Sequence, residues 1–138
     1  MEVNATLPSH VEVVVVGGGP AGAVAARMLA QLGVTVALLE AGQRVPLVGE
    51  TLPPAVRPVL DRLGLRATVE AEGYLPSVGS WSAWGDAEPW GRDFIFSYFG
   101  HGWHLDRRRF DALLREAARA AGARLAVGAS VTTSTRTR

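Results

Sequence analysis

The sequence contains no cysteine and no lysine. The absence of cysteine excludes disulfides, thiolate metal sites and a redox-active dithiol. Because lysine is missing, all 14 basic residues are arginine. Any mechanism that depends on a lysine amine is therefore excluded for this chain.

Long apolar runs and a strong net charge are also missing. No apolar run approaches the roughly 18 residues of a membrane-spanning helix, so we expect no membrane span. Residues 1–10 are polar and lack both a basic start and an apolar core, which does not fit a signal peptide. We therefore expect a cytoplasmic protein. The net charge is only +1, so the protein has no strong positive field that would attract an anionic polymer. We therefore expect no nucleic-acid partner.

The composition is that of an ordinary globular domain. Hydrophobic residues make up 48% of the 138 residues and charged residues 20%, which fits one domain. His101 and His104 lie close in sequence, but no third cluster of ligand-type residues accompanies them. We therefore expect no metal site.

The N-terminal part predicts a β-α-β unit. Residues 11–16 are β-branched and almost wholly apolar, which is typical of a strand buried on both faces of a parallel sheet. A glycine-rich turn at residues 17–22 leads into a predicted helix at residues 20–32. Residues 34–39 predict a second buried strand that closes on Glu40. The crossover between the two strands is expected to be right-handed.

The rest of the chain predicts a longer mixed region before the parallel sheet resumes. We expect a loop at 41–52, a helix at about 53–63, a short helix within 66–75, short strands at 79–84, 93–98 and 102–105, a helix at 107–121 with its arginines outward, a strand at 123–127, and a short strand or frayed tail at 130–138. The predicted fold class is α/β, with a parallel sheet in the order 3-2-1 and a small antiparallel β excursion.

The turn at residues 17–22 carries the spacing Gly-x-Gly-x-x-Gly. Gly17 permits the tight turn, Gly19 leaves room for a pyrophosphate, and Gly22 lets the helix pack closely on the strand. Pro20 and Ala21 begin the helix, whose free N–H groups and dipole favour a phosphate there. The pattern predicts a dinucleotide-binding site. The alternative is a glycine-rich turn that lets the helix pack on the strand and binds no ligand.

Glu40 supports the nucleotide interpretation. At the end of the second strand, its carboxylate can accept hydrogen bonds from a ribose diol and disfavours a 2′-phosphate, which argues against NADP. Ala41 follows it in the predicted site. The pattern alone does not distinguish FAD from NAD. However, residues 41–122 separate the second and third parallel strands, a longer interruption than an NAD domain usually has.

Three segments resemble one superfamily of flavoproteins. They are VVVVGGGPAGAVAARMLAQLGVTVALLEAG, VGETLPPAVRPVLDRLGL and WHLDRRRFDALLREAARAAGARL. In their order and spacing they resemble the N-terminal portion of the aromatic hydroxylase, flavin-dependent halogenase and geranylgeranyl reductase superfamily. The resemblance implies a Rossmann-like FAD-binding domain and FAD as its cofactor.

The resemblance also implies further cofactor-binding residues. Glu50 and Thr51 would lie near the flavin, Arg107 would contact the phosphate or ribityl region, and Val131 would lie near the adenine through its backbone. Arg44 would approach the adenosine ribose or phosphate. Glu50 could instead be a solvated loop acid, and Arg44 and Arg107 could be surface arginines. No catalytic side chain is assigned, because the flavin itself carries the chemistry.

Three reaction classes follow from the resemblance. We expect a monooxygenase-like oxidoreductase that acts on a small organic substrate and takes electrons from NAD(P)H or a reduced flavin. The halogenase-like branch implies a lysine within the stretch covered here, and this chain has none, so halogenation is the weaker alternative. Alkene reduction, as in the geranylgeranyl reductase branch, is a further alternative.

The resembling proteins are longer than this sequence. Their second glycine-aspartate motif and their substrate domain have no counterpart here, so we interpret residues 1–138 as a partial, truncated FAD-binding domain without a substrate domain. An unpaired apolar edge on the first strand would favour pairing with the missing C-terminal half. A non-catalytic nucleotide-binding module or remnant, inactive by itself, is therefore an alternative of a different class.

Overall fold

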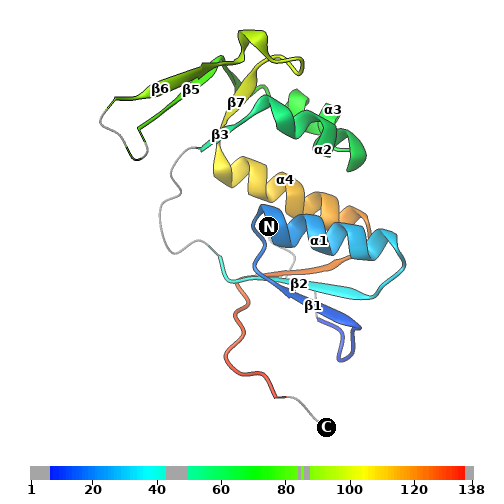
Figure 1. Cartoon of the computed structure of the whole chain (residues 1–138). Helices are drawn as coiled ribbons and strands as arrows, with labels where there is room; N and C mark the ends of the chain where they lie inside the picture. The colour runs from blue at the N-terminus through cyan, green and yellow to red at the C-terminus, as the bar shows by residue number, and fades with distance from the viewer. Residues whose placement is uncertain (1–6, 43–49, 84, 86–87, 136–138) are drawn as a thin grey trace. The chain divides into compact units, whose positions relative to one another are not determined.

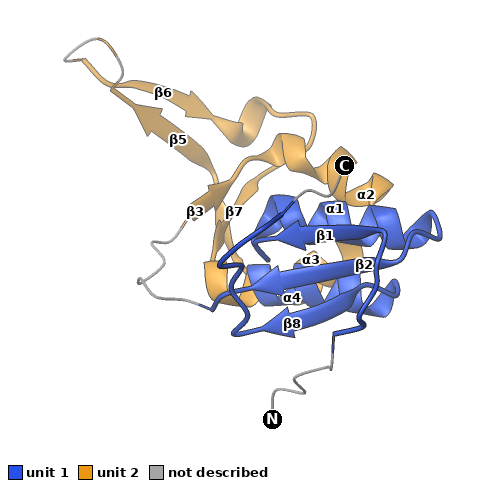
Figure 2. Cartoon of the chain, turned by 90° about the horizontal axis from the view of Figure 1, so that it is seen from below, with its two compact units in different colours: residues 1–46, 111–138 blue, residues 47–110 orange. Residues whose placement is uncertain are grey.

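The chain divides into two compact units. The structure, a computed structural model, describes residues 7–42, 50–83, 85 and 88–135. Unit 1 comprises residues 1–46 and 111–138, and unit 2 comprises residues 47–110 (Figure 2).

Unit 1 contains the predicted parallel sheet. Its elements are β1 (Val13–Val16), α1 (Pro20–Gln31), β2 (Val36–Glu40), the greater part of α4 (Arg107–Ala120) and β8 (Arg124–Val127). The strands are parallel in the order β1-β2-β8, which confirms the predicted order 3-2-1. Helices α1 and α4 lie on the same face of this sheet (Figures 1 and 2).

The burial of β1 differs from its prediction. The first three residues of the central strand β2 are buried, with Leu38 at 0% exposure, but Val14 and Val16 of β1 are 51% and 64% exposed. Val15 faces α1, since a Cβ on Gly22 would lie 3.3 Å from its Cγ1. Because side chains alternate along a strand, Val14 and Val16 point away from α1. The expectation that β1 is buried on both faces is therefore wrong. Among the described residues, none covers the face of β1 that points away from α1.

Unit 2 is the antiparallel excursion together with short helices. Its elements are β3 (Glu50–Leu52), the 3₁₀ turn η1 (Pro54–Val56), α2 (Arg57–Arg62), α3 (Arg66–Ala71), β4 (Leu75–Ser77), β5 (Gly79–Ser82), β6 (Trp90–Asp93), the 3₁₀ turn η2 (Phe94–Phe96) and β7 (Gly102–Leu105). Strands β3, β7 and β4 form one antiparallel sheet, and β5 pairs with β6 in another. The predicted excursion is confirmed and is larger than expected.

Two local predictions in unit 2 are wrong, and one of its strands was not predicted. Strand β3 lies inside the predicted loop at 41–52, and β4 was not predicted at all. Both strands have only three residues and depend on pairing with β7, so they carry little local signal. The predicted strand at 93–98 is instead the end of β6 followed by η2. There the carboxylate of Asp93 accepts a hydrogen bond from the Ile95 amide at 2.9 Å, which favours a turn over an extended strand.

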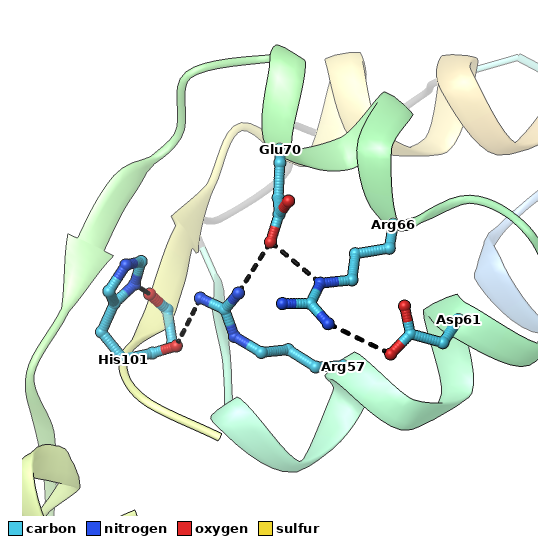
Figure 3. Close-up of polar contacts among 6 residues, drawn as sticks. Arg57, Asp61, Arg66, Glu70 and His101 are labelled. Atoms are coloured by element: carbon cyan, nitrogen blue, oxygen red, sulfur yellow. Dashed lines mark hydrogen bonds and ion pairs between the residues drawn. The ribbon is translucent and has the colours of Figure 1, made fainter. Parts of the chain in front are cut away.

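A buried arginine joins the helices of unit 2 to β7. The Arg57 guanidinium donates to Glu70 Oε1 at 2.7 Å and to the His101 carbonyl at 3.2 Å (Figure 3). It also lies 4.2 Å from the centroid of the Trp103 ring. Arg66 donates to the same Glu70 oxygen at 3.1 Å. These contacts couple α2, α3 and β7 through one charge network.

The network should respond to acid. The pKa of Glu70 is lowered, first by the hydrogen bond from Arg66 and also by the charges of Arg66 and Arg57. A carboxylate with a lowered pKa stabilises the fold at neutral pH, and this contribution is lost as the pH falls through the lowered folded-state pKa.

We predict that Arg57→Met lowers the free energy of unfolding by about 2 kcal/mol, because the charged hydrogen bonds disappear while the apolar stem remains. Urea denaturation at pH 7 measures the change. Arg62→Met is the matched control, since Arg62 lies on the same helix but is exposed, and it should alter stability by less than about 0.5 kcal/mol. Equal effects of the two substitutions would contradict the prediction.

Two remaining segments complete the fold. Residues 128–135 form neither helix nor strand, so the described part of the tail does not contain the short strand considered for it. Within the described residues, no helix is both long and apolar enough to cross a membrane.

Candidate dinucleotide-binding site

The glycine-rich turn connects β1 to α1 in unit 1. Gly17 has φ +101°, a value that side chains other than glycine rarely adopt. Its amide donates to the Leu39 carbonyl of β2 at 2.8 Å. A Cβ on Gly22 would lie 1.9 Å from the Gly17 carbonyl oxygen. These two glycines are therefore required by the turn and by the close packing of helix on strand, as predicted.

The first turn of α1 presents its amides without a competing acid. Gly19 is the N-cap residue, Pro20 begins the helix and Ala21 follows. The described first turn carries no acidic side chain and no side-chain cap. A Cβ placed on Gly19 would have no atom within 4 Å. This end of α1 is thus a positive, open surface that fits a pyrophosphate.

Glu40 lies at the end of β2 and braces the turn. Its Oε2 accepts the Gly18 amide at 2.6 Å, and its Oε1 accepts the Gly42 amide at 2.9 Å. An ionised carboxylate has about four acceptor positions, so capacity remains for a ribose diol. Ala41, which lies between Glu40 and Gly42 in the sequence, is exposed. The residues of unit 1 consequently fit the adenosine diphosphate half of a dinucleotide.

The segment after β8 continues beside the end of β2. The Ala129 amide donates to the Glu40 carbonyl at 3.1 Å, and Val131, two residues later, is 46% exposed. This position is compatible with the backbone contact to adenine predicted for Val131. Arg44, the other residue predicted near the adenosine, lies outside the described residues.

The remaining predicted residues belong to unit 2. Glu50 of β3 forms an ion pair with Arg107, the first residue of α4, whose side chain is only 15% exposed. Thr51 Oγ1 lies 3.2 Å from Nδ1 of His104, its partner across the β3–β7 pair. Arg107 therefore does not point freely into solvent, which corrects the expectation that the arginines of this helix all face outward.

Arg115 contacts the glycine-rich turn, although the sequence pattern did not place it there. It was grouped with the outward arginines of the helix, yet it is half-buried and donates from Nη1 to the Gly18 carbonyl at 3.1 Å. The available signal was helical spacing, because residue 115 shares a face with Asp111 and Ala118, both of which are buried.

A comparison with protein families identifies the chain. Residues 10–138 match the model of the family described as FAD binding domain. This chain belongs to that FAD-binding domain family. Tryptophan 2-halogenase from Chondromyces crocatus is 36% identical to this FAD-binding domain over 126 residues, which are 91% of the chain and 24% of that protein. The chain thus spans about a quarter of the length of the curated relatives it matches.

Solved structures agree with this assignment. The flavin-dependent halogenase CmlS has a TM-score of 0.73 and 30% identity, covering 92% of this FAD-binding domain and 24% of that chain. A geranylgeranyl bacteriochlorophyll reductase-like protein from Thermoplasma acidophilum has a TM-score of 0.61 and 28% identity, covering 86% and 30%. The predicted superfamily, fold class and FAD cofactor are confirmed.

Proposed function

We propose that unit 1 of this FAD-binding domain holds the adenosine diphosphate half of FAD, in a flavin-dependent, monooxygenase-like oxidoreductase. The observation that carries the cofactor assignment is the open, acid-free start of α1 beside Glu40. Gly17, Gly19 and Gly22 shape the phosphate-binding turn, and the Glu40 carboxylate accepts the ribose hydroxyls.

Glu50, Thr51 and Arg107 are proposed to serve the flavin side of the cofactor. The ion pair between Glu50 and Arg107 supports this role, because it holds a largely buried arginine side chain in a defined orientation. Val131 and Arg44 are proposed to lie near the adenosine.

The bound flavin supplies the redox chemistry, and the side chains of this chain bind and orient the cofactor. In the proposed reaction one oxygen atom of dioxygen enters a small organic substrate and the other is reduced to water, with two electrons supplied by NAD(P)H or a reduced flavin. The second candidate is halogenation. It is favoured by the names of relatives such as the tryptophan 2-halogenase, but it is weakened by the absence of lysine from this sequence.

The cofactor assignment predicts that the purified 138-residue chain binds both FAD and ADP. Quenching of flavin fluorescence measures FAD, and competition by ADP measures the shared half of the site. FAD that binds at least about tenfold more tightly than ADP would support flavin contacts beyond the adenosine diphosphate. Equal affinities would favour the non-catalytic nucleotide-binding module, and no binding of either ligand would refute the proposed site.

The reaction class is tested by product analysis. The FAD-loaded protein is supplied with NAD(P)H or reduced flavin, dioxygen, chloride and a panel of small aromatic compounds, and the products are identified by mass spectrometry. A product that has gained an oxygen atom supports monooxygenation. A product in which chlorine replaces hydrogen supports halogenation and contradicts the preferred reaction.

A further inference from the structure

We propose that Arg115 is a positioning residue for the phosphate-binding turn: by holding the Gly18 carbonyl, it aims the next amide toward the cofactor's pyrophosphate. This inference rests on the proposed function of unit 1. It assigns a cofactor-related role to a residue of α4 that lies outside the Gly-x-Gly-x-x-Gly pattern.

Arg115 contacts the turn both through a hydrogen bond and through the packing of its stem against Gly18. Arg115 Nη1 donates to the Gly18 carbonyl oxygen at 3.1 Å. A Cβ on Gly18 would lie 2.7 Å from Arg115 Cδ and 2.9 Å from Glu40 Oε2. Gly18 is buried, so the arginine stem and the Glu40 carboxylate leave no room for a side chain there. The turn is therefore held between a cation from α4 and an anion from β2.

The two contacts fix successive peptide units of the turn. Glu40 accepts the Gly18 amide at 2.6 Å, which orients the peptide between residues 17 and 18. Arg115 holds the Gly18 carbonyl, which belongs to the peptide between residues 18 and 19. In a planar trans peptide the N–H points opposite to the C=O. Fixing the Gly18 carbonyl consequently fixes the direction of the Gly19 N–H.

This arrangement is suited to an anionic ligand. The Gly19 amide lies at the start of α1, where a Cβ would find no neighbour within 4 Å. A donor that is already oriented loses little conformational entropy when the ligand binds. The Arg115 charge also lies beside the turn, where it attracts the pyrophosphate. Both effects act on the phosphates and leave adenosine recognition unaffected.

A structural bond elsewhere on the same helices provides the matched control. Arg27 of α1 donates from Nη1 to the Ala117 carbonyl of α4 at 3.0 Å. It is a partly buried bond from an arginine side chain to a backbone carbonyl, as the Arg115 bond is, but it does not involve the turn. If Arg115 only joined α4 to its surroundings, Arg115→Met and Arg27→Met would affect ligand binding alike.

The experiment measures the dissociation constants of ADP and adenosine for the 138-residue chain by calorimetry and ligand-observed NMR. We expect Arg115→Met to weaken ADP binding about tenfold and adenosine binding less than about twofold. Arg27→Met should change the ratio of the two constants by less than about twofold. Arg115→Lys keeps the charge but not the planar fork, so it should recover part of the loss, leaving ADP about threefold weaker.

Several outcomes would overturn the inference. Unchanged ADP binding by Arg115→Met would do so, as would equal weakening of ADP and adenosine. If Arg115→Met does not fold, Arg115→Lys provides the test. A ratio of ADP to adenosine affinity in Arg115→Lys equal to that of the wild type would reject the positioning role. Failure of the wild-type chain to bind ADP would instead reject the proposed function, so the two failures are distinguishable.

Discussion

Gly19→Glu should eliminate ADP and FAD binding while the chain stays folded. The backbone at Gly19 has φ −72°, which any residue can adopt, and a Cβ there meets no atom within 4 Å. A carboxylate at the N-cap is also favourable for the helix dipole. The same carboxylate, however, occupies and charges the region that the pyrophosphate needs. We expect at least about a 100-fold loss of affinity, or about 2.7 kcal/mol.

Fluorescence titration with FAD and thermal unfolding of the ligand-free chain check this prediction together. Gly22→Ala is an informative contrast, because its Cβ would lie 1.9 Å from the backbone oxygen of Gly17. Backbone cannot rotate away as a side chain can, so this variant should lose both stability and binding. If Gly19→Glu still binds ADP within about threefold of the wild type, the phosphate site is not at this turn.

Glu40→Ala should weaken ADP binding by about 100-fold, because charge-assisted hydrogen bonds to the ribose are lost and the turn loses its anchor. The carboxylate accepts the Gly18 and Gly42 amides, and alanine leaves both without this acceptor. We therefore also expect a lower melting temperature for the ligand-free chain. Calorimetry with ADP and differential scanning calorimetry of the chain give the two measurements.

Glu12→Ala is the control for the loss of a bracing carboxylate. Glu12 accepts the Thr35 amide at 2.8 Å and the Thr35 hydroxyl at 2.7 Å. These residues precede β1 and β2, so the contact lies at the opposite end of the parallel strands from Glu40. Its removal should leave ADP affinity within about twofold of the wild type. Equal loss of affinity in both variants would attribute the Glu40 effect to general weakening of the sheet.

Much of unit 1 could be predicted because its signals are local. The apolar strands, the glycine spacing and the terminal Glu40 lie within one β-α-β unit, where spacing in sequence determines spacing in the fold. The prediction was less accurate in unit 2. Alternating aromatics suggested a strand at 93–98, but local capping by Asp93 produces the turn η2.

The sequence by itself determined the β-α-β unit, the helix α4 and the glycine-rich turn, because each depends on residues close together in the chain. Only the tertiary structure decided which distant residues support that turn. The Arg115–Gly18 bond joins residues 97 positions apart, and β3 and β4 exist as strands through pairing with β7. Helical spacing can indicate that residue 115 faces inward, but the partner in each of these contacts is set only when distant parts of the chain meet in the fold.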